Sequence, residues 1–227
     1  MYVLGIDTST LTGGVALLKQ GELVGESVLN IRTTHSERLL PALEILLEQA
    51  NITPQELDGI AVVTGPGSFT GIRIGVSTAK GLAYALDHPL VGTTTLEAYG
   101  WQFKYFPGAV ISLIDARREQ VYWQAFEAGE GLNEPAHGPL SDVYTYCARL
   151  SRPCLFVGDG ALAYAERIGE QVPTGIFPSP ALSLLRPSAV ADLGYTRLLQ
   201  GNSSNAFALN PTYMRKTEAE LKWQEKA

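Results

Sequence analysis

Apolar residues occur in three short runs at the start of the chain. The runs cover residues 2–6, 13–18 and 23–29, and polar residues or glycine separate them. Apolar runs of this length with turn residues between them are typical of strands that are joined as hairpins. The pattern therefore predicts a three-stranded antiparallel meander.

The spacing of apolar residues changes to that of a helix after position 35. Over residues 36–50, leucine stands at positions 39, 40, 43, 46 and 47, which form one stripe along a helix. Ser36 is a suitable N-cap, and the helix dipole favours Glu37 in the first turn. A buried strand is expected at 60–63 and a long helix at 70–86.

The second half of the chain begins with strands again. Pro107-Gly108 interrupts the pattern after a strand at 90–92 and a helix at 94–105, so we expect two lobes, 1–106 and 107–227. In the second lobe, the pattern predicts strands at 109–114, 120–126 and 154–157 and a helix at 188–200. The charged tail at 214–227, with Glu218 and Lys222 at helical spacing, is either a helix or a frayed end.

The composition of the chain is that of a folded globular protein. Hydrophobic residues make up 45% and charged residues 18% of its 227 residues. The net charge of −6 gives no sign of a basic face, so we expect any contact with RNA to be shared with a partner. The first residues lack the basic and apolar regions of a signal peptide, so we expect none, and no apolar run approaches the roughly 18 residues that span a bilayer. We therefore expect a cytoplasmic protein without a membrane segment, in which Cys147 and Cys154 are reduced, semi-buried thiols.

The first candidate for chemistry is the turn between the first two strands. Here Asp7, Thr8 and Ser9 place a carboxylate at a strand end, followed by hydroxyl groups that could hold a metal ion and phosphate oxygens. The alternative is a hairpin turn in which these side chains bond the backbone. The pattern is short and weak on its own, so we favour the hairpin turn.

The second candidate is the glycine-rich stretch GPGSFTG at 65–71. It follows a strand and opens a helix, so its N–H groups could cradle an anion. The stretch lacks the Gly-Lys-Ser/Thr of a P-loop, and its third glycine is one residue late for a dinucleotide motif. We favour a plain strand-to-helix turn that Ser68 or Thr70 caps.

The helix that follows carries small residues at every fourth position. Glycine inside a helix costs up to about 1 kcal/mol relative to alanine, so a repeat of this kind indicates close approach of another helix. That helix is either the internal one at 36–50 or one of another chain. The repeat consists of Gly71, Gly75, Ala79 and Ala83.

Two other groups of polar residues could act in catalysis. The turn Asp115–Glu119 carries two acids and two arginines and is either an acid/base cluster or a solvated turn with compensating charges, which we favour. The three histidines stand far apart in the sequence and form no zinc motif.

Six stretches of the sequence resemble the TsaB (YeaZ) family, in the order in which that family has them. They cover nearly the whole chain, and the longest is quite specific. The stretches are IDTST at 6–10, THSERLLP at 34–41, GPGSFTGIRIG at 65–75, PLVGTTTLEA at 89–98, IDARREQVY at 114–122 and NPTYMRK at 210–216.

The resemblance implies an α/β protein with the ASKHA fold of actin, Hsp70 and sugar kinases, in which two RNase H-like lobes hold mixed sheets flanked by helices. The family belongs to the machinery that makes threonylcarbamoyladenosine in tRNA. Its catalytic member is the homologue TsaD, a Gcp-like protein of the glycoprotease class. The resemblance makes this chain a non-catalytic scaffold that pairs with TsaD and supports binding of the ATPase TsaE, and that touches tRNA only through the complex.

The resemblance also indicates where an active site has been lost. Thr95 and Tyr99 stand where TsaD has the two histidines of its metal site, and neither is a good ligand for iron or zinc; Glu97 alone cannot hold a metal ion. The turn Asp115–Glu119 replaces a glycine-rich phosphate loop, and Gly158-Asp159-Gly160 looks like a remnant of the adenine-side loop. We therefore expect no cofactor and no metal, with Asp7, Thr8 and Ser9 as a vestige of a nucleotide loop.

These observations lead to a docking hypothesis. The helices at 36–50 and 70–86 would pack on matching helices of TsaD as a four-helix bundle, or form a homodimer when that partner is absent. The rival hypothesis is an enzyme, either like a metallopeptidase or like a small-molecule kinase, or a protein that binds nucleotide weakly. The residues expected in the interface are Leu39, Leu40, Leu43, Leu47, Gly71, Ile72, Gly75 and Ala79.

Overall fold

The first three strands form the expected meander and continue into a five-stranded sheet. A computed structural model describes residues 1–30 and 35–214. The sheet has the order β3-β2-β1-β4-β5. Strand β2 is antiparallel to both β1 and β3, and β4 and β5 are parallel to β1. Its strands are β1 (Tyr2–Asp7), β2 (Thr12–Lys19), β3 (Glu22–Asn30), β4 (Gly59–Val63) and β5 (Leu90–Thr93).

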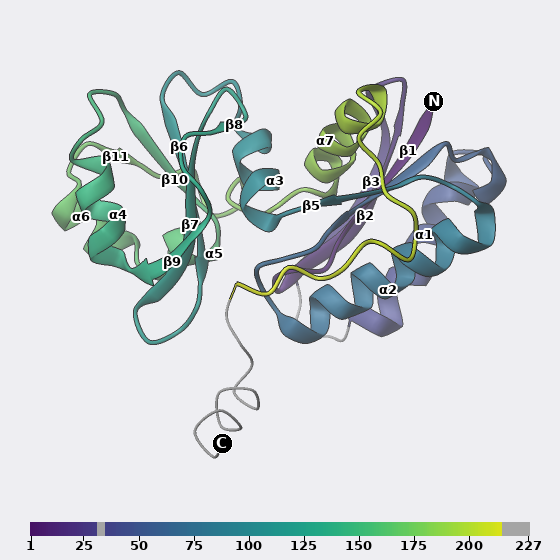
Figure 1. Ribbon diagram of the computed structural model, residues 1–227, viewed down its shortest axis with the longest axis horizontal. Coiled ribbons are helices and arrows are strands. Elements are labelled where there is room, and N and C mark those ends of the chain that lie inside the picture. The colour runs from purple at the N-terminus through teal and green to yellow at the C-terminus, as the bar shows by residue number, and fades with distance from the viewer. Residues whose placement is uncertain (31–34, 215–227) are drawn as a thin grey trace, which may run out of the picture.

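Helices cover both faces of this first sheet. Helices α1 (His35–Gln49) and α2 (Phe69–Leu86) contact each other on one face, and α7 (Pro187–Leu199) lies on the opposite face (Figure 1). The α7 helix can lie close to the strands because Gly5 and Gly194 present no side chain where the backbones meet. A short 3-10 helix, Pro54–Glu56, leads into β4.

The second lobe repeats the same strand order. Its sheet runs β11-β10-β6-β7-β8, with β9 also paired to β7, so β6 has an antiparallel neighbour on one side and a parallel one on the other, as β1 has. This repeat confirms the fold class of two RNase H-like lobes. The strands are β6 (Ala109–Asp115), β7 (Gln120–Glu127), β8 (Glu130–Gly131), β9 (Ala136–Pro139), β10 (Cys154–Val157) and β11 (Gly175–Ile176). The helices are α4 (Leu140–Cys147), α5 (Asp159–Ala163) and α6 (Ala165–Gln171).

The α3 helix (Thr95–Gln102) joins the two lobes. It contacts β6 and β7 of the second lobe and α7 of the first (Figure 1). Gly100 lies against the ring of Phe126, where a Cβ would overlap the ring, and Trp101 Nε1 donates to Asp192 Oδ2 of α7 over 2.6 Å. The expected helix at 94–105 is thus shorter than predicted, and its position between the lobes is set by contacts with both.

The expected second lobe, 107–227, needs a correction at its C-terminal end. The chain crosses back after the second sheet, so that α7 and residues 204–214 pack on the first lobe. Ser204 pairs with Leu90 of β5, and Thr212 N donates to Thr64 O over 2.8 Å. The second lobe therefore ends before α7. Most of the charged tail predicted at 214–227 lies outside the described residues.

Candidate functional site

The turn between β1 and β2 packs against the first turns of α2. Asp7 Oδ1 accepts hydrogen bonds from Ser9 N and Ser9 Oγ over 2.8 and 2.7 Å, and Thr8 Oγ1 donates to Gly71 O over 2.7 Å. Ser68 N donates to Ser9 O over 2.6 Å. The three side chains suggested as a nucleotide loop are therefore bonded to the chain itself, which is the hairpin alternative.

Burial changes the acidity of the carboxylate in this turn. Asp7 is 0% exposed, and its Oδ2 has no hydrogen-bond partner among the described residues. Desolvation raises the pKa of Asp7 to about 6, although the hydrogen bonds from Ser9 and the charge of His35 lower it in part. The cost of burial thus outweighs the local hydrogen bonds.

A cleft of about 500 Å³ lies between the lobes at this turn. Its first-lobe wall includes Ser9, Thr10 and His35, whose Nε2 lies 3.0 Å from Thr10 O. Its second-lobe wall includes Asp115 and Asp159. Of the three residues of the suggested nucleotide loop, only Ser9 lines the cleft.

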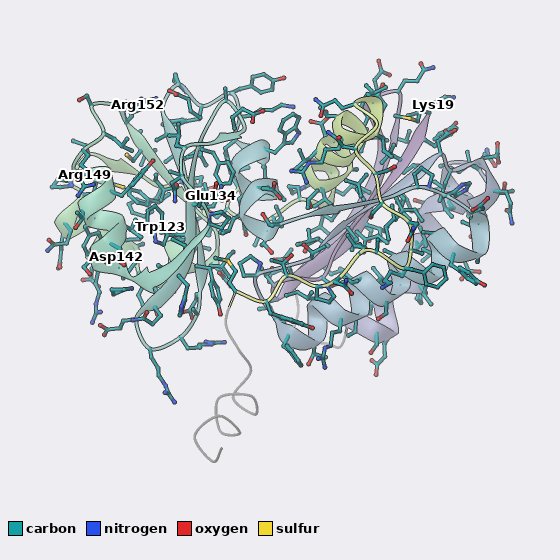
Figure 2. All side chains as sticks on the ribbon, in the orientation of Figure 1. Lys19, Trp123, Glu134, Asp142, Arg149 and Arg152 are labelled. Atoms are coloured by element: carbon teal, nitrogen blue, oxygen red, sulfur yellow. The ribbon has the colours of Figure 1, made fainter. Side chains whose placement is uncertain are left out.

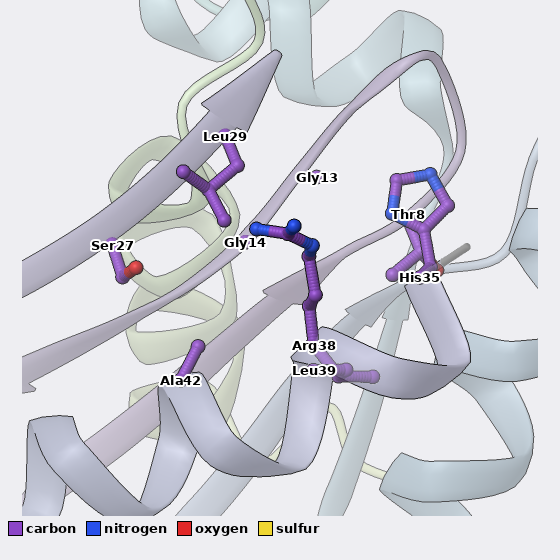
Figure 3. Close-up of a pocket in the computed structure, with 9 residues that line it drawn as sticks. All are labelled: Thr8, Gly13, Gly14, Ser27, Leu29, His35, Arg38, Leu39 and Ala42. Atoms are coloured by element: carbon purple, nitrogen blue, oxygen red, sulfur yellow. The ribbon is translucent and has the colours of Figure 1, made fainter. Parts of the chain in front are cut away.

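A second and smaller cavity lies beneath His35, between α1 and strands β2 and β3 (Figure 3). Its volume of about 20 Å³ has room for a single water molecule. Gly13 and Thr8 form part of its wall, and the ring of His35 lies where a Cβ of Gly13 would be. This cavity is too small for a nucleotide or a metabolite.

The turn after β6 has a left-handed backbone conformation that glycine usually adopts. Arg117, Arg118 and Glu119 all have positive φ angles, of 68°, 53° and 62°. Asp115 Oδ1 accepts hydrogen bonds from Arg117 N and Tyr164 Oη, each over 2.9 Å. Three exposed residues with full side chains thus stand at backbone positions that glycine would usually occupy.

The charges of this turn are compensated, as the solvated-turn interpretation requires. Arg117 Nη1 lies 3.5 Å from Asp115 Oδ2, and Arg167 Nη1 forms an ion pair with Glu119 Oε1 over 2.8 Å. Asp159 Oδ1 accepts from Asp115 N over 3.0 Å, and burial raises the pKa of Asp159. The pair of acids is part of a structural network in the cleft wall.

The two residues that were expected to stand in place of metal ligands, Thr95 and Tyr99, have structural roles in this chain. Thr95 Oγ1 donates to Pro66 O over 2.5 Å, and Tyr99 is buried, which raises the pKa of its hydroxyl. Glu97 caps α3 through Thr94 N and forms an ion pair with Arg197 of α7. Within residues 1–30 and 35–214, no cluster of histidine, cysteine, aspartate and glutamate has a metal-binding arrangement.

Seven of the eight residues expected in a partner interface lie inside the chain's own core, so the residue assignment was wrong. The leucine stripe packs on the first sheet, and a Cβ on Gly71 or Gly75 would overlap Thr8 O or Thr8 Oγ1. The glycines thus make room for the β1–β2 turn, and Gly75→Leu would damage the fold itself. The buried residues are Leu39, Leu43, Leu47, Gly71, Ile72, Gly75 and Ala79.

The exposed side of the two helices carries a different set of residues, which we call the outer helix face. Of the expected interface residues, only Leu40 lies on it, with 52% of its surface exposed. Gly81 is exposed in the interior of α2, and apart from the backbone of its own helix and its chain neighbours no described atom lies within 4 Å of the position of its Cβ. Its spacing places it outside the four-residue repeat, so the repeat could not reveal it. We use this name for five exposed residues of the two helices, Leu40 and Glu44 of α1 and Thr70, Ser77 and Gly81 of α2.

The segment 204–214 covers another side of α2. Arg73 stacks on Phe69, 3.7 Å from its ring centre, and its Nε donates to Tyr213 Oη over 3.0 Å. Lys80 Nζ donates to Leu209 O over 2.9 Å. The pattern of apolar residues gave no signal for this packing, which leaves the outer helix face as the uncovered side of α2.

Comparisons with known proteins agree on one group of relatives. The profile of the family described as "TsaD: tRNA N6-adenosine threonylcarbamoyltransferase" matches residues 23–223. The "tRNA threonylcarbamoyladenosine biosynthesis protein TsaB" of Bacillus subtilis is 36% identical over 230 residues, which cover 99% of each chain.

Solved structures show the same relationship. The structure of YeaZ from Pseudomonas aeruginosa has a TM-score of 0.77 and 28% identity, and the match covers 94% of this chain and 99% of that one. Component A of the (R)-2-hydroxyglutaryl-CoA dehydratase of Acidaminococcus fermentans has a TM-score of 0.55 at 14% identity, covering 88% of this chain and 99% of that one. A similarity as distant as the second concerns the fold alone.

Proposed function

Because the chain belongs to the TsaB (YeaZ) family, we propose that it is a non-catalytic subunit in the biosynthesis of threonylcarbamoyladenosine in tRNA. Family membership gives the chain a role in this modification together with a TsaD homologue. The proposal adds that the chain contributes a docking surface and no catalytic group. It also assigns that surface to the outer helix face of α1 and α2.

Gly81 is the observation that supports this docking surface most strongly. An exposed glycine in a helix interior costs about 1 kcal/mol relative to alanine. The other two glycines of α2 are accounted for by the β1–β2 turn, whereas nothing in the described part of the chain approaches Gly81. A helix of a partner could lie close to α2 at this point, with Ser77 and Leu40 beside the contact.

The state of the cleft supports the non-catalytic role. Thr95, Glu97 and Tyr99 each serve the packing or capping of α3, and the turn after β6 has arginine and glutamate at positive-φ positions where a phosphate loop would have glycine. The Asp7 turn is bonded to α2 in the same way. Chemistry would then belong to the TsaD homologue, with this chain stabilising and positioning it.

Further parts of the proposal concern the other components of the complex. In the absence of a TsaD homologue, the outer helix face would pair with a second copy of the chain. TsaE would join the assembled pair, and tRNA would be bound by the complex, since the chain is acidic. No helix in the described part of the chain combines the length and hydropathy needed to cross a bilayer.

The docking surface is tested by replacing Gly81 with leucine. The side chain has free space in the isolated chain and leucine favours the helix, so Gly81→Leu should remain folded. It should lose co-purification with the TsaD homologue because the added side chain keeps the partner helix away. The measurement is the yield of partner retained on the tagged chain, together with the melting temperature of each variant.

A matched control exists in the second lobe. Apart from the backbone of its own helix and its chain neighbours, Gly169 of α6 also has no described atom within 4 Å of its Cβ position, so Gly169→Leu introduces the same side chain far from α2. This variant should retain the partner. Equal retention by the two variants would refute the docking surface.

The rival hypothesis of a nucleotide-binding enzyme is tested separately. The hydroxyl-lined cleft of about 500 Å³ is the feature that keeps it under consideration. Calorimetry of the purified chain with ATP and Mg²⁺ should show no stoichiometric binding. Tight binding would support the rival, and a tRNA modification assay with and without the chain would then decide between the two.

A further inference from the structure

The first sheet has one edge that no other described strand covers. Strand β3 is the end strand of this sheet, and among the described strands it pairs with β2 alone. Alternate residues of an edge strand direct their N–H and C=O groups away from the sheet. The pairing with β2 is regular from Gly25 to Asn30, and β3 contains neither lysine nor proline, which commonly protect an exposed edge. This edge can therefore accept a further strand.

A groove of about 500 Å³ lies along the same edge, between β3 and α1, and we call it the β3 groove. Gly25 and Leu29 line it from the strand and Ile45 lines it from the helix. Leu29 and Ile45 expose 38% and 54% of their surface. A groove between an edge strand and a helix is suited to an extended peptide that adds a strand to the sheet. We propose that the β3 groove binds an extended, acidic segment of another protein in this way.

The side chains of β3 are divided between the groove and the opposite face of the sheet. A Cβ on Gly25 would lie 2.8 Å from Leu46 Cδ1 of α1, and Leu29 lines the cavity beneath α1. Glu26 points to the other face, where its Oε1 accepts from Ser188 N of α7 over 2.8 Å. An added strand has the same alternation, so every second side chain of the bound segment would enter the groove.

Arg38 gives the groove a positive charge that the described part of the chain does not compensate. Arg38 lines the β3 groove, and its side chain extends from α1 toward the strands (Figure 3). It forms no ion pair with a described residue. Glu37 also lines the groove but stands about 100° away around the helix, and Glu26 is held by Arg186 on the opposite face. Charge complementarity therefore favours an acidic side chain on the bound segment.

A second copy of the chain would fill the groove less well than a single strand. Helix α1 lies mainly against β2. In a dimer joined through two β3 strands, the two α1 helices would be about three strand spacings apart, which is ~14 Å. Helices that pack on each other are about 8–10 Å apart. The groove would stay partly empty in such a dimer, whereas the side chains of one added strand would lie within it.

A random library of short peptides displayed on phage tests the groove on the full-length chain. Enriched peptides should share apolar residues at alternate positions and an acidic residue. A synthetic copy of the most enriched peptide then serves as the probe in fluorescence anisotropy. The inference goes beyond the proposed function, and its test uses no TsaD homologue, so the two can fail separately. A library without enrichment would overturn the proposal.

Charge exchange tests the role of Arg38. Arg38→Glu should weaken binding of the synthetic peptide by about tenfold or more, and lysine in place of the peptide's acidic residue should restore binding to this variant. Arg149→Glu is the matched control, because Arg149 is exposed on the side of the second lobe that faces away from the first (Figure 2). Melting curves report whether both variants remain folded. Equal affinity of the two variants for the acidic peptide would contradict the proposal.

N-methylation of the peptide tests whether it binds as a strand. Methyl groups on every second amide remove the donors along one edge of a strand. One of the two alternating sets should abolish binding and the other should leave it nearly unchanged, and hydrogen exchange at residues 25–30 should slow when the unmethylated peptide binds. Equal effects of the two sets would overturn the proposal. So would slower exchange at 25–30 that appears with increasing chain concentration and without peptide, because it would identify a second copy as the occupant.

Discussion

At the scale of single residues, the fold buries the carboxylate of Asp7 in surroundings that destabilise its charged form. Asp7 lies at the end of β1 with one oxygen bonded to Ser9 and the other without a partner among the described residues. Its pKa is raised from 3.8 to about 6 because burial penalises the charged form. Under the proposed non-catalytic role, such a carboxylate brings a cost in stability and no benefit.

The cost predicts that Asp7→Asn stabilises the chain at neutral and alkaline pH. A folded-state pKa above the unfolded one means that ionisation of Asp7 opposes folding above pH 6, by up to about 3 kcal/mol for a shift from 3.8 to about 6. The asparagine keeps an acceptor for Ser9 and cannot ionise. The free energy of unfolding at pH 8, from urea titrations, should therefore increase in the variant.

The pH dependence of the difference is the control for this prediction. The advantage of Asp7→Asn should shrink as the pH falls below 6 and should vanish below about pH 3, where Asp7 is protonated in both the folded and the unfolded state. A variant that is less stable at pH 8, or a difference that does not change with pH, would show that the carboxylate is stabilised by something other than the contacts described above.

At the scale of elements, the glycines of α2 divide into two kinds. Gly71 and Gly75 face the β1–β2 turn, where a side chain would overlap Thr8. Gly81 faces open space. Gly71 and Gly75 therefore make room for the β1–β2 turn, whereas Gly81 has no packing role within the first lobe.

This division predicts opposite effects of alanine at the two kinds of position. Gly75→Ala should lower the free energy of unfolding by about 1–3 kcal/mol because its Cβ overlaps Thr8 Oγ1, and Thr8→Ala in the same chain should restore part of the loss. Gly81→Ala should instead raise it by up to about 1 kcal/mol. Denaturant unfolding of the four chains measures both, and a destabilising Gly81→Ala would mean that Gly81 is packed.

The elements themselves were largely predictable because their signals are local. The meander, α1, α2 and α7 follow from the period of apolar residues over a few turns or strands. The leucine stripe of α1 showed that one side is buried but gave no indication of what covers it, and the chain's own sheet covers it. Short elements such as β8 and α5 have too few residues for a period.

The site was less predictable because its contacts join residues far apart in the sequence. The role of Glu97 depends on Arg197, which lies 100 positions later on a helix that returns from the other lobe. The return of α7 and the segment 204–214 to the first lobe has no local signal either. The open side of α2 could be found only after these segments were placed.

At the scale of the whole molecule, the two lobes are held together from both sides of α3. Trp101 Nε1 and Lys104 Nζ both donate to Asp192 of α7, over 2.6 and 2.8 Å, and Ser112 Oγ of the second lobe donates to Leu96 O over 3.0 Å. Helix α3 is therefore fixed to both lobes. A scaffold that positions a partner benefits from such a connection, because a docking surface on one lobe then has a fixed orientation relative to the other.

Site-specific photo-crosslinking from the outer helix face tests the docking account most directly. A benzoylphenylalanine placed at Ser77, which is exposed on α2, should crosslink to the TsaD homologue when the two proteins are mixed. The same group at Ser141, which is exposed at the start of α4 in the second lobe, should give no crosslink. Crosslinks from position 141 and none from position 77 would contradict the account.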